Sequence, residues 1–108
     1  MIHFDFEKIA RHPFAVHCPT KEDAEFLFEF LRNETDVLWC TGTALKETNW
    51  SMHADRTHYD FGSHRRGLQY GNGTWGRNNG SQFMTMHEFI AMYHAEDDAV
   101  FIDLSHIL

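Results

Sequence analysis

The sequence predicts an α+β fold: a single domain over residues 1–108, with a β-α-β start packed on a mostly antiparallel sheet, a second short helix and a C-terminal strand. Three observations support this class. Residues 14–42 can be interpreted in order as strand, capped helix and strand. The middle of the chain alternates apolar and polar residues, as half-buried antiparallel strands do. A chain of 108 residues has room for one hydrophobic core.

The β-α-β start has a physical signal at each boundary. Residues 14–18 form a short β-rich run, and Pro19 then lacks a backbone donor, so strand pairing is expected to stop there. Thr20 and Asp23 resemble a capping box, which places the start of a helix at about Lys21. Residues 37–40 predict a second buried strand, which ends at residues 41–42.

Apolar residues at helical spacing predict which face of the first helix is buried. The expected core stripe consists of Ala24, Leu27, Phe28 and Leu31. Phe26 and Phe30 widen this stripe beyond what contact with one sheet face requires, so either a second element or a partner should cover them. The opposite side carries Glu22, Glu25, Glu29 and Arg32.

The remaining elements are shorter. Residues 1–12 fit either an edge strand or a single helical turn. Residues 56–61 alternate and predict a strand with Thr57, Tyr59 and Phe61 buried, joined by a loop at residues 62–67 to a returning strand that starts at Leu68. Residues 71–80 contain two Asn-Gly pairs and predict a loop.

The C-terminal part is expected to add a strand, a helix and a last strand. Residues 81–85 predict the first of these strands, and Thr85 with Glu88 forms a second capping-box pattern ahead of a helix over residues 86–95. An acidic turn at residues 96–98 then leads to a final strand at residues 99–102.

Composition narrows the classes of function. The formal net charge of −7 argues against direct nucleic-acid binding, because phosphate contacts need a basic surface. No apolar run reaches the ~18 residues of a membrane span, and the first residues carry acids, so we expect a soluble, cytoplasmic protein without a membrane partner. Cys18 and Cys40 are expected to be reduced thiols inside buried strands.

Three motifs could carry chemistry, and each has a competing structural explanation. Residues 71–76 match G-x-G-x-x-G, but turn residues follow where a dinucleotide site needs a helix. The nine histidines lack a spacing that brings two imidazoles to one cation, so we expect no metal or other cofactor. A cysteine paired with a histidine could act as a nucleophile, but buried thiols do not suit this role, so we expect no enzyme.

Two surfaces remain for binding. The first is acidic and aromatic, although such a surface can also be an ordinary solvated face. It comprises Glu22, Glu25, Phe26, Glu29, Phe30, Glu96, Asp97 and Asp98. The second is the loop over residues 62–80, where glycine amides and arginines could hold a phosphate while an aromatic ring stacks on a base. It comprises Arg65, Arg66, Tyr70, Gly71, Gly73, Trp75 and Arg77.

The β-α-β start carries V-H-C-x-T-x-E-D-A, and W-C-x-G follows the expected helix. With these motifs the sequence resembles a group of small phage-encoded proteins of uncharacterised function. The matching positions are Val16, His17, Cys18, Thr20, Glu22, Asp23, Ala24, Trp39 and Gly42. The resemblance covers about a third of the chain and implies an origin in a mobile element.

Small acidic accessory proteins of phages often act by stoichiometric binding, so the resemblance implies two functions. In the first, the protein is a non-enzymatic, anti-CRISPR-like inhibitor in the host cytosol. It would contact a host defence protein, a nucleic-acid-binding effector, through the acidic and aromatic surface. In the alternative, it is an anti-defence sponge that binds a nucleotide signal through residues 62–80 and forms a homo-oligomer.

Overall fold

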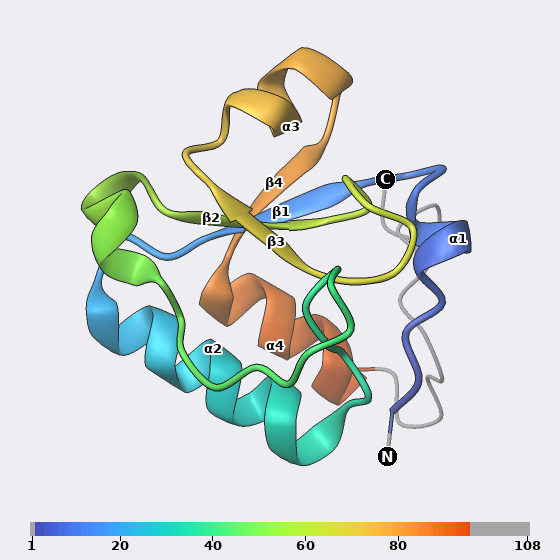
Figure 1. Ribbon diagram of the computed structural model, residues 1–108, viewed down its shortest axis with the longest axis horizontal. Coiled ribbons are helices and arrows are strands. Elements are labelled where there is room, and N and C mark those ends of the chain that lie inside the picture. The colour runs from blue at the N-terminus through green and yellow to red at the C-terminus, as the bar shows by residue number, and fades with distance from the viewer. Residues whose placement is uncertain (1, 96–108) are drawn as a thin grey trace.

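A four-stranded mixed sheet in the order β3-β2-β1-β4 forms the centre of the fold (Figure 1). The computed structural model describes residues 2–95. β1 pairs antiparallel with β2 and parallel with β4, while β2 pairs antiparallel with β3. The α+β class and the mostly antiparallel sheet are therefore confirmed. The strands are β1 (Phe14–His17), β2 (His58–Phe61), β3 (Gln69–Gly71) and β4 (Gln82–Thr85).

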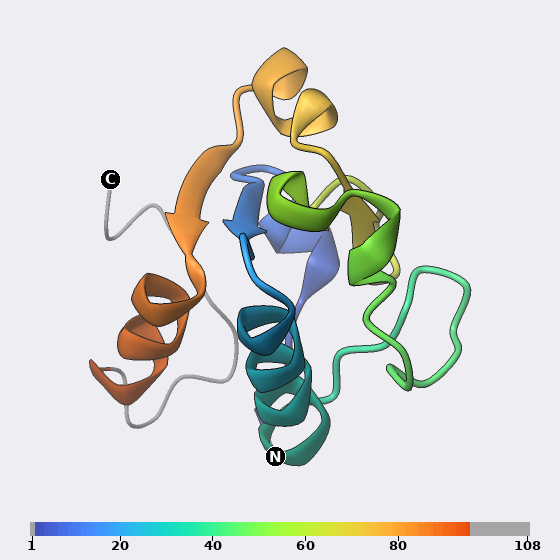
Figure 2. The ribbon, with the colours of Figure 1, turned by 90° about the vertical axis from the view of Figure 1, so that its left-hand side faces the viewer.

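Helices cover both faces of this sheet (Figures 1 and 2). α2 (Lys21–Glu34) and α4 (Met86–Ala95) pack on one face, and the short α3 (Thr74–Asn79) lies over the other. α1 (Phe6–Ile9) precedes β1, so residues 1–12 contain the helical turn that was one of the two alternatives. Two 3₁₀ turns, η1 (Trp50–Met52) and η2 (Ala54–Arg56), lead into β2.

Aromatic side chains fill the core between the sheet and the helices. Phe14 stacks on Phe61 with 4.6 Å between ring centroids, and Phe61 lies 5.3 Å from Phe89 of α4. Phe28 of α2 meets Tyr59 edge-on at 4.9 Å, a favoured aromatic geometry. The predicted core stripe of α2 is fully buried, and so are the three predicted positions of residues 57–61.

Both predicted helix caps are present. The Thr20 hydroxyl accepts from the Asp23 amide at 3.1 Å, and α2 begins at Lys21 as expected. At α4 the capping box is reciprocal: the Glu88 amide donates to the Thr85 hydroxyl at 3.0 Å, and the Thr85 amide donates to the Glu88 carboxylate at 2.9 Å. These local bonds fix where each helix leaves the sheet.

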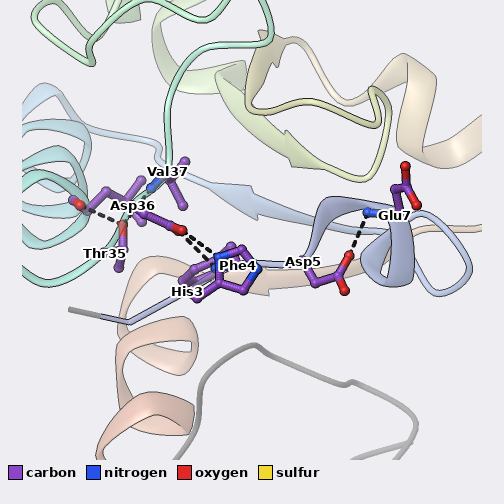
Figure 3. A network of polar contacts seen from close by, with 8 residues as sticks. His3, Phe4, Asp5, Glu7, Thr35, Asp36 and Val37 are labelled. Carbon is purple, nitrogen blue, oxygen red and sulfur yellow. Dashed lines mark hydrogen bonds and ion pairs between the residues drawn. The ribbon is translucent and has the colours of Figure 1, made fainter.

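A polar network ties the N-terminal segment to the end of α2 (Figure 3). The Phe4 amide donates to the Asp36 carboxylate at 2.9 Å, and the ring of His3 contacts the other oxygen of the same carboxylate. The Thr35 hydroxyl donates to the Leu31 carbonyl and accepts from the Val37 amide. The network closes one end of the core, where Phe4 is buried.

The prediction of a second strand at residues 37–40, in the expected β-α-β unit, is wrong. Residues 37–40 make only a single parallel bridge, between Trp39 and Leu68 at the edge of β3. The chain turns away at once because Gly42 has a φ of 87° and its amide donates to the Trp39 carbonyl at 2.8 Å. Cys40 is consequently half-buried in a turn, whereas Cys18 is fully buried.

The glycine-rich stretch is not only a loop, because α3 forms inside it. Gly73 (φ 89°) and Gly80 (φ 71°) occupy the two caps of this helix in the left-handed region. The Asn79-Gly80 pair therefore ends a helix instead of making a hairpin turn. The expected acidic turn at residues 96–98 and the final strand at residues 99–102 lie outside the described residues.

Candidate functional site

An exposed stripe along α2 carries most of the described part of the predicted acidic surface. Helical spacing places its members on one side of the helix. Phe26 is 57% exposed in the middle of this stripe, although removing an aromatic side chain from water is energetically favourable. This acidic stripe consists of four exposed residues, Glu22, Glu25, Phe26 and Glu29.

The charges of the acidic stripe form few direct ion pairs. Lys21 forms one ion pair with Glu25 at 3.9 Å, between two exposed side chains. Glu22 and Glu29 form no ion pair with a side chain that the structure describes. A hollow between α2 and residues 46–51 has three cations and three acids in its lining, which are Lys21, Arg32, Lys46, Glu25, Glu29 and Glu47. Phe26 therefore lies among three glutamates, with cations on the side of the helix that faces the hollow.

Phe26 and Phe30 have different environments. The ring of Phe30 is half-buried and meets Phe89 of α4 at a right angle, with centroids 6.0 Å apart. A second element of the chain thus covers Phe30, while Phe26 stays open to solvent. The other predicted members of the surface, Glu96, Asp97 and Asp98, lie outside the described residues.

A pocket of about 430 Å³ lies at the free edge of β3. Trp39 and Tyr70 provide its two aromatic walls, with ring centroids 5.9 Å apart and ring planes at 72°. The bridge between Trp39 and Leu68 brings these distant parts of the chain together. The lining residues are Trp39, Cys40, Thr41, Thr43, Asn49, Leu68, Gln69 and Tyr70.

The loop residues predicted for nucleotide binding fall on two faces of the sheet. Tyr70 pairs with Tyr59 and shares its face, whereas the next residue, Gly71, pairs with His58 on the opposite face. Arg65 and Arg66 are exposed in the loop that returns to the pocket. Gly73, Trp75 and Arg77 belong to α3 or its N-cap, on the face of His58.

A polar layer beneath α3 is the feature that sequence reasoning missed. The alternation of residues 56–61 predicts a solvent-exposed face for His58 and Asp60, but only 7% and 4% of these residues are exposed. His58 stacks on His17 of β1 with 4.5 Å between ring centroids. A Cβ on Gly73 would lie only 2.9 Å from the His58 ring, so α3 sits directly on it. The sequence feature that could have indicated this cover is the pair of glycines, Gly73 and Gly80, that cap α3.

Burial determines the protonation of this layer. Desolvation lowers the pKa of His58, the hydrogen bond to the Arg56 carbonyl opposes this, and the nearby His17 and Arg77 lower it further. Burial raises the pKa of Asp60 to about 6, and its Oδ1 atom has no hydrogen-bond partner among the described residues. The layer favours neutral side chains and supports the position of α3.

The two cysteines differ in burial, and Cys18 is unsuited to act as a nucleophile. Burial, together with the nearby Asp23 charge, raises the pKa of Cys18 to about 12, which leaves it protonated at neutral pH. Cys40 is half-buried at the pocket. Among the side chains that the structure describes, no cluster of three histidine, cysteine or acidic residues is placed to hold a metal ion.

Comparisons with known proteins add no relative. No protein-family model, curated protein or solved structure matches this chain. None of the helices in the described part of the chain is long and apolar enough to cross a membrane.

Proposed function

We propose that this protein is a non-enzymatic, phage-type accessory protein that inhibits a host immune effector by stoichiometric binding through the acidic stripe. The observation that carries the proposal is Phe26, an exposed aromatic side chain between three exposed glutamates. Aromatic anchors surrounded by polar groups are typical of interface hot spots. The surrounding negative charge favours a basic partner, such as the groove of a nucleic-acid-binding effector.

The two parts of the stripe would act differently on binding. Phe26 would enter an apolar pocket of the partner, and removal of its ring would mainly speed dissociation. The glutamates would attract the basic surface from a distance, so their effect would appear in the association rate and would weaken as salt increases.

Inhibition assays against a panel of purified host immune nucleases test this proposal. We expect at least one nuclease to be inhibited stoichiometrically and Phe26→Ala to weaken that inhibition by about tenfold to a hundredfold. Met52→Ala is the matched control, because Met52 is also an exposed apolar residue but lies outside the stripe. If both variants lose the same amount of inhibition, or if Phe26→Ala inhibits as well as the wild type, the acidic stripe is not the binding surface.

A second candidate function is nucleotide binding at the edge of β3. It is favoured by the pocket, where Tyr70 is 37% exposed and in edge-to-face contact with Trp39. In this proposal the protein sequesters a nucleotide signal instead of contacting a protein. Calorimetry with a panel of linear and cyclic nucleotides tests it, and the absence of heat with all of them would exclude it.

A further inference from the structure

We propose that the pocket at β3 binds the adenine ring of a nucleotide and that Asn49 recognises the edge of that ring. The inference rests on the second candidate function and names both the base and the residue that selects it. Its site is built by residues 39–43, Asn49 and residues 68–70, which come from three separate parts of the chain.

The aromatic walls suit a planar ligand. The pocket volume of about 430 Å³ falls within the ~300–1,000 Å³ that is usual for small-molecule sites. Because the rings of Trp39 and Tyr70 are 72° apart, a flat ring that stacks on one of them meets the other edge-on. Both contacts are favourable aromatic geometries. Stacking accepts every base, so selection must come from polar groups.

Asn49 supplies a suitable polar group. Its side-chain amide makes no hydrogen bond with the residues that the structure describes, although it lines the pocket. An amide offers one donor and one acceptor side by side, which matches N7 and the N6 amino group of adenine. Guanine presents two acceptors at the same positions, so it would leave the amide oxygen without a donor.

The backbone holds Asn49 in place for this role. Its φ of 57° lies in the left-handed region, which asparagine and aspartate tolerate better than most residues. The carbonyl of Asn49 also accepts from the Met52 amide at 3.1 Å, at the start of η1. Aspartate can therefore replace Asn49 with little strain, and this substitution exchanges the amide donor for a charged carboxylate oxygen.

Two arginines lie on the chain that leads to the pocket. Gly67 packs so closely on the backbone of Leu38 and Trp39 that a Cβ would lie 2.4 Å from the Leu38 carbonyl oxygen. Arg65 and Arg66 directly precede this contact, are exposed, and form no ion pair within the described part of the chain. Neither arginine lines the pocket, so the phosphate of a bound nucleotide would lie outside it, toward the loop that carries these guanidinium groups.

Isothermal titration calorimetry with AMP, GMP, CMP and UMP on the full-length protein tests the inference. We expect AMP to bind at least about tenfold more tightly than GMP, and Asn49→Asp to weaken AMP binding by about tenfold to a hundredfold. Asn78→Asp is the matched control, because it makes the same change at an exposed position of α3 away from the pocket. Circular dichroism confirms that both variants fold.

The outcomes separate the inference from the function on which it rests. If AMP binds best, and Asn49→Asp weakens AMP binding more than it weakens UMP binding while Asn78→Asp changes neither, the inference is supported, because repulsion between the new carboxylate and a phosphate would weaken both nucleotides equally. If all four nucleotides bind equally, or Asn49→Asp binds AMP as the wild type does, adenine recognition by Asn49 is overturned while nucleotide binding stands. If none of the four binds, the inference is overturned, the cyclic nucleotides of the wider panel decide the second candidate function, and the acidic stripe is unaffected.

Discussion

Asp60 gives the sharpest stability prediction, because its carboxylate is buried without compensation. Only 4% of the residue is exposed, and Oδ1 has no partner among the described residues. Burial raises the pKa of Asp60 from 3.8 to about 6. Folding therefore favours the protonated acid. At neutral pH, burial of the ionised carboxylate lowers the free energy of unfolding by about 3 kcal/mol.

The substitution Asp60→Asn removes the charge and keeps the shape. At pH 7 we expect the variant to be more stable than the wild type by about 1–3 kcal/mol, the lower value applying if the amide also lacks partners. The sign follows from the raised pKa of Asp60. Its proton-linked stability is fully present below pH 3.8 and is lost as the pH rises through 6. The advantage of the variant should therefore shrink toward zero near pH 4.

Urea unfolding at pH 4, 5, 6 and 7 measures this difference. His58 has the opposite pH dependence, since its lowered pKa costs stability as the pH falls below 6.5, but it is present in both proteins and cancels in the comparison. Asp55→Asn is the control, because Asp55 is exposed and its change should stay within about 0.5 kcal/mol. A variant that is no more stable than the wild type at pH 7 would refute the uncompensated burial of Asp60.

Three further predictions concern local packing. Gly73→Ala should destabilise the protein by about 1–3 kcal/mol more than Gly42→Ala in urea unfolding, because both have positive φ but only Gly73 touches the His58 ring; equal losses would contradict the contact of α3 with His58. Thr85→Ala should cost about 1 kcal/mol through loss of the α4 capping box, whereas no change would mean that the cap is dispensable. Cys40 should react with a thiol reagent in the native protein at pH 8, whereas Cys18 should react only after unfolding. The reason is that Cys18 is buried and has a pKa of about 12. Equal reaction rates of the two thiols in the native protein would contradict this difference.

Sequence patterns predicted the elements whose signals are local. The caps at Thr20 and Thr85 each place a hydroxyl next to the amide three residues on, so a few adjacent residues determine where α2 and α4 begin. The apolar spacing of α2 likewise determined its buried face. Period-two alternation located β2 but assigned His58 and Asp60 to solvent, since a strand pattern carries no information on what covers its polar face.

The remaining features depend on distant contacts. Residues 37–40 have the composition of a buried strand, yet only the edge of β3 is available to them and Gly42 turns the chain away. α3 contains Gly76 and two asparagines, which are weak helix formers, and it is stabilised by packing on His58 and Phe83. The pocket requires Trp39, Asn49 and Tyr70 to meet, and no local pattern encodes that meeting.

The salt dependence of inhibition by charge-reversed protein tests the proposed function most directly. The variant is Glu22→Lys, Glu25→Lys and Glu29→Lys combined, and Glu7→Lys is the control at an exposed glutamate of α1. Against an immune nuclease that the wild type inhibits, the triple variant should lose at least about tenfold in potency at low salt, with a smaller loss at 0.5 M salt. If its potency matches the wild type and the control at both salt concentrations, the acidic stripe is not the binding surface.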